Sequence, residues 1–391
     1  MKKLFALVLA LALCLTAFTA VAEVEGVKLG VILLHDEDST YDLNFINGVN
    51  EAVAALGLSE DQVIMKRNIP ESNDCYEAAL DLADEGCNII FANSFGHESF
   101  LLEAAKECPD VQFCHATGTM AHTAGVANFH NAFAAIYEGR FLAGVAAGMM
   151  LNEMIENGTI TADQAKMGYV GAYPYAEVKS GYTSFYLGAK YICPSVTMDV
   201  RFTNSWFDIA AEKEAAISLI NDGCVLVSQH ADSEGAPKAC EENNIPNVAY
   251  NISTISIAPT TALISSKIDW QPYMELMIKA AQEGTEIPVD YCGTIKTGSV
   301  DLTELNAACA AAGTQEKIDE VKALIESGEL KVFDTATFTK DGAALTTYLA
   351  DVDTDDAFTP DTEAIANGAF EESKHRSAPY FDIDIDGITL K

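Results

Sequence analysis

The stretch from Tyr76 to Phe91, YEAALDLADEGCNIIF, decides the fold, because the stretch from Glu212 to Val227, EKEAAISLINDGCVLV, nearly repeats it. Each copy has a helical pattern, then a Gly-Cys pair, then an apolar run of strand length. Gly86 and Gly223 stand 137 residues apart. A duplicated helix–strand unit predicts two similar α/β lobes with a cleft between them.

Two further matches extend the repeat on both sides of these stretches. Val27-Lys28-Leu29-Gly30 opens the first half and Ala165-Lys166-Met167-Gly168 opens the second. An Ile-Asn-Gly-Val step around Gly48 corresponds to Tyr-Leu-Gly-Ala around Gly188. Since the matches keep one order and nearly one spacing, we interpret them as an internal duplication.

Strand-like and helix-like runs alternate along the chain, which is typical of βαβ units and parallel sheets. The expected strands are Lys28–Leu34, Gln62–Lys66, Asn88–Ala92, Val111–His115, Met167–Ala172, Thr197–Phe202, Cys224–Gln229, Asn247–Tyr250, Ala262–Ser265, Tyr291–Thr294 and Leu330–Phe333. The expected helices are Tyr41–Leu56, Cys75–Glu85, Ser99–Cys108, Ala132–Ile155, Ser180–Ile192, Ala210–Asp222, Gly235–Asn243, Tyr273–Gln282 and Gln315–Ser327. In the helix between the halves, small residues such as Gly144 and Gly148 permit close packing against a neighbour.

We predict an α/β protein of two Rossmann-like lobes, each a parallel sheet flanked by helices. The first lobe is expected to comprise 27–131 plus 257–293, and the second 132–252 plus 294–333. Residues 334–391 read as an acidic extension that packs on the second lobe. Its aspartates 351, 353, 355 and 356 approach the spacing of a calcium loop, but Asp356 replaces the required glycine, so we interpret the run as a solvated acidic loop.

The first 22 residues read as a secretory signal peptide, with Lys2 and Lys3, an apolar run, and Ala20-Val21-Ala22 before Glu23. The apolar run is short for a membrane anchor. A lipid attached at Cys14 is disfavoured because Leu13 is too large for the usual attachment box. We therefore expect an extracytoplasmic protein, at the outer face of the membrane or in the periplasm.

The charge and the cysteine content of the chain indicate which binding partners to expect. The chain has 58 acidic and 23 basic residues, so we expect a monomer that nucleic acid and anionic membranes repel. Most of the ten cysteines fit buried apolar positions, although Cys108 and Cys114 are close enough in sequence to pair. No cysteine–histidine spacing indicates zinc, and we expect neither metal nor cofactor.

Aromatic and polar residues follow the expected strands, where open parallel sheets bind ligands. Rings would stack on a flat ligand, and carboxyl and amide groups would bind its edge. The alternative is that each ring is a core residue. The candidates from this pattern are Tyr41, Asp42, Phe95, Trp206, Asp232, Asn251 and Trp270.

Three stretches carry a family resemblance: Asp38–Gly48 (DSTYDLNFING), the pair Ala92–Gly96 (ANSFG) and Glu107–Phe113 (ECPDVQF), and Tyr137–Gly148 (YEGRFLAGVAAG). They resemble the basic membrane protein (BMP) family of substrate-binding proteins, which serve ABC importers. The resemblance runs from about Val27 to Phe333. It implies a type I periplasmic-binding-protein fold, ABC permease subunits as partners, and a purine base or nucleoside as ligand.

The resemblance also assigns roles to single residues. Tyr41 occupies the place of the ring that stacks on the purine. Asn251 stands where the family has a ribose-binding aspartate, which favours a free base, and the segments 203–208 and 229–232 resemble adenine-type binders. Lys267 either matches the ribose-contacting lysine of nucleoside binders or, beside Trp270, helps to close the lobe.

Two other functions compete with this reading. A sugar-binding or sensory relative would share the fold, although such sites usually bring several charged side chains to the hydroxyls. An exported nucleoside hydrolase would need catalytic groups, and His230 beside Asp232 is the only suggestive pair. No nucleophile elbow, phosphate loop or metal spacing is present, so we expect no enzyme.

Overall fold

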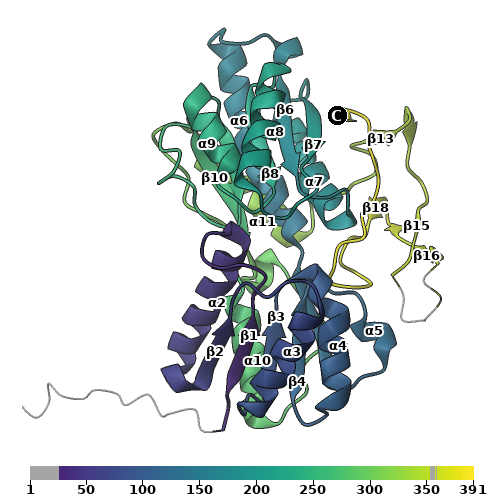
Figure 1. Ribbon diagram of the computed structural model, residues 1–391. Helices are drawn as coiled ribbons and strands as arrows, with labels where there is room; N and C mark the ends of the chain where they lie inside the picture. The colour runs from purple at the N-terminus through teal and green to yellow at the C-terminus, as the bar shows by residue number, and fades with distance from the viewer. Residues whose placement is uncertain (1–25, 353–356, 358) are drawn as a thin grey trace, which may run out of the picture.

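Two β-sheets, one in each lobe, organise the chain (Figure 1). The computed structural model describes residues 26–352, 357 and 359–391, so the expected signal peptide, Cys14 and the aspartates 353, 355 and 356 lie outside the described residues. The first sheet is wholly parallel and contains, in spatial order, β11 (Asp290–Gly293), β5 (Phe129–Ala134), β4 (Gln112–Ala116), β3 (Ile89–Ala92), β1 (Leu29–Ile32) and β2 (Val63–Lys66).

The second sheet repeats this order and adds one strand at the far edge. It contains β12 (Val300–Leu302), β10 (Ala262–Ile268), β9 (Asn247–Tyr250), β8 (Leu226–His230), β6 (Lys166–Gly171), β7 (Thr197–Phe202) and β19 (Ile388–Leu390). Only the β10–β12 pair is antiparallel. The predicted α/β class with two similar lobes is thereby confirmed.

Helices cover both sheets (Figure 1). The first lobe carries α2 (Thr40–Leu56), α3 (Asn73–Asp84), α4 (Glu98–Glu107), α5 (Ala121–Ala124) and α10 (Gln271–Glu283). The second carries α6 (Ile136–Glu156), α7 (Ala176–Ile192), α8 (Ile209–Asn221), α9 (Gly235–Asn243) and α11 (Thr314–Ser327). Side-chain caps fix where several helices begin: Ser39 Oγ accepts from Asp42 N at the start of α2, and Asp208 accepts from Ala211 N at the start of α8.

The duplicated turns adopt one geometry. Gly86 and Gly223, which follow α3 and α8, have φ of 89° and 88°, a left-handed conformation that favours glycine. The cysteines after them, Cys87 and Cys224, are buried. All nine cysteines of the described residues are free thiols, so Cys108 and Cys114 do not pair.

Two glycines of the repeat allow helices to approach closely. A Cβ at Gly188 on α7 would lie 2.0 Å from the carbonyl oxygen of Phe141 on α6, and one at Gly144 on α6 would lie 2.1 Å from that of Phe185. A Cβ at Gly48 on α2 would lie 2.6 Å from Trp270 Cβ, at the start of α10. The close packing predicted from the small residues of α6 is therefore present, and the matched glycines of the two halves serve the same purpose.

The chain passes between the lobes after β5, after β10 and after β11. This corrects one predicted boundary. Residues 257–293 were assigned to the first lobe, but β10 pairs with β9 and β12 in the second sheet, and only from α10 onward does the chain return to the first. A short apolar strand after a loop carries no sign of which sheet it joins.

Other elements differ from the prediction as well. Phe129–Ala134 forms β5, whereas the sequence pattern placed Ala132 at the start of a helix. The strand β12 was not predicted. Leu330–Phe333 was predicted as a strand but forms none; Val332 and Phe333 are buried because the extension covers them, with Phe381 stacked on Phe333 at 4.4 Å between ring centroids.

The extension runs along one side of the molecule (Figure 1). It contains the small hairpin strands β13 (Thr339–Lys340), β14 (Ala343–Ala344), β15 (Leu349–Ala350), β16 (Thr362–Glu363), β17 (Ile365–Ala366) and β18 (Ala369–Phe370), and ends in β19 beside β7. On the second lobe, Lys179 Nζ lies 2.8 Å from Asp382 Oδ1. On the first, Ser377 N donates to Asp290 Oδ2 at 2.6 Å. The extension therefore contacts both lobes.

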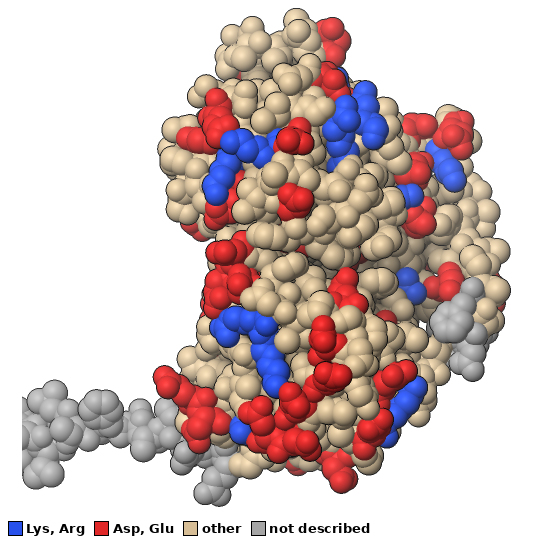
Figure 2. Space-filling model, viewed as in Figure 1, with Lys and Arg blue, Asp and Glu red and all other residues tan. Residues whose placement is uncertain are grey.

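Acidic side chains lie on both lobes of the face that Figure 2 shows, as the formal net charge of −35 requires. Among residues 26–352, 357 and 359–391, no helix is long and apolar enough to cross a membrane.

Candidate functional site

A small cavity lies where the two lobes meet. Its walls come from residues that follow strands or begin helices in both lobes: Leu34, Tyr41, Ser94, Phe95, Thr117, Glu177, Trp206, His230 and Asp232. These positions cluster because the carboxyl ends of parallel strands share one edge of each sheet. The volume is about 20 Å³, room for one or two water molecules. A larger ligand enters only if the lobes move apart.

The lobes touch beside this cavity. Thr40 N, at the start of α2, donates to Asp232 O of the second lobe at 2.8 Å. One turn further along α2, Asn44 Nδ2 donates to Ile268 O of β10 at 2.9 Å. The structure is therefore a closed arrangement.

Three aromatic side chains line the cavity, as the sequence predicted they would converge. Tyr41 donates its hydroxyl to Asn93 O at 2.7 Å, which holds its ring in place. Phe95 is 45% exposed, and its ring centroid lies 5.9 Å from that of Tyr175 in the opposite lobe. The Trp206 ring packs edge-on against Tyr173, with centroids 5.1 Å apart.

Two carboxyl groups line the cavity from the second lobe. Asp232 is buried, and burial raises its pKa well above the usual range, with the charges of Glu212, Asp42 and Glu177 adding to the effect. A neutral acid can both donate and accept a hydrogen bond. Glu177, the second residue of α7, was not among the sequence candidates, because the segment after the Met167–Ala172 strand was not considered.

His230 supports Glu177 from behind. The Nε2 atom of His230 lies 3.3 Å from Glu177 Oε1, and the imidazole is buried. Burial lowers the pKa of His230, and the nearby charge of Arg140 lowers it further, so the ring is neutral. The pairing with a carboxylate assigns the ring proton to Nε2.

Arg140 is the buried cation beneath the cavity. Its guanidinium lies 3.5 Å from the centroid of the Tyr250 ring, and Nη1 donates to Gln229 O at 2.9 Å. Its Nε has no hydrogen-bond partner within the described residues. A Cβ at Gly181 would lie 3.0 Å from His230 Nδ1 and 3.6 Å from Arg140 Nε, so glycine leaves His230 room that a larger residue would narrow.

Asp42 lies beside the cavity but not in its wall. Its Oδ1 accepts from Asn93 Nδ2 at 2.7 Å and from His35 N at 3.1 Å. Burial alone would raise the pKa of Asp42, but hydrogen bonds from His35, Asn93 and Ser39 outweigh it, and the pKa is lowered. Asp42 therefore connects the first turn of α2, which carries Tyr41, to His35 in the loop after β1 and to Asn93 after β3.

The other three sequence candidates line a different hollow, of about 320 Å³, between α2 and the ends of β9, β10 and β12. Asn251 is buried with φ of 72°, and its Nδ2 has no partner within the described residues. Lys267 is half-buried. Trp270 is 2% exposed, and its ring stacks on Phe45 at 4.2 Å between centroids. The Trp270 ring thus belongs to the core of the first lobe, the alternative left open for each ring.

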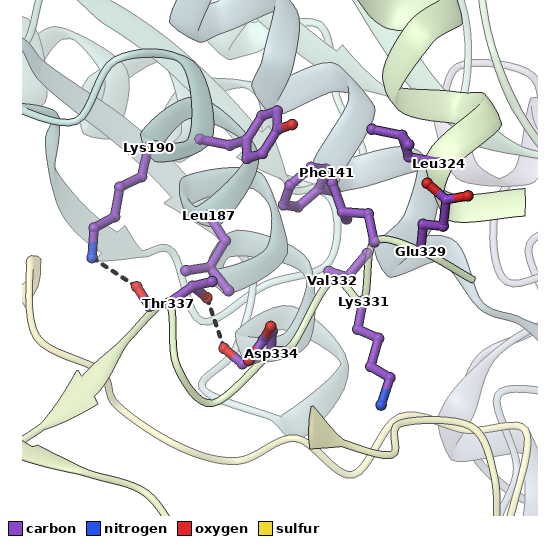
Figure 3. Close-up of a pocket in the computed structure, with 11 residues that line it drawn as sticks. Phe141, Leu187, Lys190, Leu324, Glu329, Lys331, Val332, Asp334 and Thr337 are labelled. Atoms are coloured by element: carbon purple, nitrogen blue, oxygen red, sulfur yellow. Dashed lines mark hydrogen bonds between the residues drawn. The ribbon is translucent and has the colours of Figure 1, made fainter. Parts of the chain in front are cut away.

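A larger hollow of about 480 Å³ lies far from these groups, between α6, α7, α11 and the segment 329–337 (Figure 3). Phe141, Leu187 and Val332 form its apolar walls. The Lys190 ammonium at its rim donates to Thr337 O at 3.0 Å. This hollow receives no side chain from the first lobe.

Metal binding has no support in the described residues, which contain no group of three or more histidine, cysteine or acidic side chains able to hold an ion. Three of the four aspartates of the calcium-like run, 353, 355 and 356, lie outside them.

Two parallel α/β lobes that enclose a cavity at the carboxyl ends of their strands form the type I periplasmic-binding fold. Solved structures agree. The ABC transporter solute-binding protein of Conexibacter woesei superposes with a TM-score of 0.63 at 18% identity, covering 78% of this chain and 98% of that one. The one from Aeropyrum pernix gives 0.65 at 17% identity, covering 79% and 93%.

Sequence comparison gives the family. Residues 30–334 match the Bmp family, described as ABC transporter substrate-binding protein PnrA-like, and the chain belongs to it. A purine-binding protein of Brucella abortus is 32% identical over 293 residues, 75% of this chain and 79% of that protein. A Haloferax volcanii protein, provisionally named an ABC transporter glucose-binding protein, is 32% identical over 254 residues, 64% of this chain and 60% of that protein.

Proposed function

We propose that this protein binds a free purine base, adenine in the first place, in the cavity between its lobes and delivers it to the permease of an ABC importer. The cavity itself carries the proposal: three aromatic side chains and two carboxyl groups meet at the lobe interface. Rings bind the flat faces of a heterocycle, and carboxyl groups bind the donors and acceptors of its edge. The purine-binding relative supports the same ligand class.

A free base is favoured over a nucleoside. Asn251 and Lys267, the residues that family resemblance connects with ribose, line the separate hollow beside α2 and not the aromatic cavity. A base alone would therefore use Tyr41, Phe95, Trp206 and Asp232 without them.

Transport would follow lobe closure outside the cytoplasm. The lobes separate by rotation about the three chain crossings, the ligand enters, and the lobes then close on it. The signal-like residues 1–22 and the family's transport role support an extracytoplasmic monomer that docks on permease subunits.

The test is a titration of the purified protein with adenine, guanine, adenosine and guanosine, followed by calorimetry and by tryptophan fluorescence. The chain has two tryptophans, and only Trp206 lines the cavity. A Trp206→Phe variant should lose the ligand-dependent fluorescence change but retain binding heat, whereas Trp270→Phe should keep the fluorescence response. No heat with any purine at millimolar concentration would refute the proposal.

A sugar ligand is the second candidate, because the hollow beside α2 is rich in polar groups. Asn47, Glu51 and Asp269 line it together with Asn251 and Lys267. Glucose, ribose, galactose and inositol belong in the same titration, and a response to one of them without a purine response would favour this alternative. Release of free base from adenosine during the titration would instead indicate a hydrolase.

A further inference from the structure

Glu177 presents a carboxylate oxygen that the fold does not use. The residue lies in the first turn of α7, and its side chain is 12% exposed in the wall of the cavity. Glu177 does not cap a helix: the N-cap residue of α7 is Tyr175, and no side chain in the described part of the chain caps this helix end. Within the described residues, Oε1 faces His230 and no hydrogen bond engages Oε2.

The surroundings fix the direction of Glu177. His230 is buried at the end of β8 and directs Nε2 toward Oε1. On its other side, His230 Nδ1 lies in the space that Gly181 leaves open beside Arg140. Because Oε1 is held from behind, Oε2 is the acceptor left for a molecule in the cavity.

Asp232 offers the opposite hydrogen-bonding character. Asp232 is buried in the same wall as Glu177, and its raised pKa favours the protonated form, whose hydroxyl can donate. No lysine or arginine is among the residues that line this cavity. The wall from the second lobe therefore presents one hydrogen-bond acceptor, the Glu177 carboxylate, and one donor, the Asp232 hydroxyl. It presents no cation that would attract a carbonyl oxygen of the ligand.

We propose that Glu177 and Asp232 together select an amino-substituted purine over the matching oxo-purine, a conclusion that rests on the proposed function. Glu177 Oε2 accepts an N–H of the exocyclic amine, and the Asp232 hydroxyl donates to the ring nitrogen beside it. Adenine offers that amine and that acceptor nitrogen side by side. His230 and Arg140 act as positioning residues behind Glu177.

Hypoxanthine is the discriminating competitor, because it has the shape of adenine with a carbonyl oxygen in place of the amine. That oxygen would face Glu177 Oε2, and two acceptors without a proton repel each other. Sites built to bond a particular donor reject analogues that lack it far more strongly than apolar pockets reject a size difference.

The experiment measures dissociation constants for adenine, hypoxanthine and unsubstituted purine by calorimetry. The wild type should prefer adenine to both by about 10- to 100-fold, the range for a hydrogen bond to a charged group. Glu177→Gln should reduce the adenine-to-hypoxanthine preference at least about tenfold, since its amide can donate to the carbonyl oxygen. Glu329→Gln, the same change in the hollow between α6, α7 and α11, should leave the preference unaltered.

The outcomes separate this inference from the proposed function. If no purine binds the wild type, the proposed function itself fails. If purines bind but Glu177→Gln keeps the wild-type preference, the inference is overturned. Should that variant fold poorly, the wild type alone decides: equal affinity for adenine and unsubstituted purine, which lacks only the amine, would overturn it as well.

Discussion

Replacing Gly188 by alanine should destabilise the protein, although alanine favours helices. A Cβ at this position of α7 would lie 2.0 Å from the carbonyl oxygen of Phe141, whereas ordinary contact begins at 3.4 Å. A backbone carbonyl cannot turn away as a side chain can, so α6 and α7 must part by more than about 1 Å along a tightly packed crossing. Such overpacking costs about 1–3 kcal/mol and sometimes more. Alanine recovers at most about 1 kcal/mol through helix propensity.

The assay is urea denaturation of the wild type, Gly188→Ala, Gly144→Ala and the double variant. Each single change should lower the urea midpoint, with the slope of the transition unchanged. The two glycines lie at one crossing, so helices already parted by the first methyl should admit the second at little extra cost, and the double loss should be smaller than the sum. A raised midpoint for Gly188→Ala, or losses that add fully, would refute the argument.

Two further predictions concern charge and the tryptophans. Burial raises the pKa of Glu372 to about 8 from its usual 4.5, so the folded protein must keep a proton that the unfolded chain has lost, and stability from this group falls as the pH rises from 4.5 to 8. Glu372→Gln should therefore gain in melting temperature over the wild type at pH 8 and not at pH 4.5; equal gains at both would contradict the assignment. Trp270→Ala should cost about 3–5 kcal/mol of stability as a core truncation, whereas Trp206→Ala should chiefly weaken ligand binding. Thermal unfolding measures the stability of both variants, and calorimetry measures their ligand binding. A stability loss in Trp206→Ala with a binding loss in Trp270→Ala would contradict the prediction.

The fold was predictable where the chain repeats itself. The strands Thr197–Phe202 and Asn247–Tyr250 and the helix Gly235–Asn243 were predicted to the residue. β5 was hidden because the chain passes from it to α6 within one residue, and apolar letters continue across the join. Leu330–Phe333 was misread because burial by a distant partner, Phe381, leaves the same apolar pattern as a strand.

The candidate site was predictable in part, because residues that follow parallel strands gather at one edge of the sheet. Tyr41, Phe95, Trp206 and Asp232 follow strands and do meet at one cavity. Trp270 also follows a strand, but its ring turns into the core against Phe45, and sequence position alone does not distinguish the two orientations. Glu177 escaped notice because the segment after the Met167–Ala172 strand was not considered, although Tyr41 and Asp42 were found on α2, the corresponding helix of the first half. A signal was available: α7 is the counterpart of α2 in the second half, and Glu177 lies in its first turn as Asp42 does in that of α2.

The C-terminal extension changes how the molecule must move. The chain crosses between the lobes three times, and the extension connects them once more through noncovalent contacts. It pairs with the second lobe where β19 lies beside β7, and it binds the first lobe through the Ser377–Asp290 hydrogen bond. Asp290 also lies 3.0 Å from His122, so the attachment is anchored on two elements of the first lobe. Separation of the lobes must either bend the extension or release it at Asp290. The described parts of 335–391, which lie beyond the family match, therefore add a second connection between the lobes that any opening of the cleft has to strain or break.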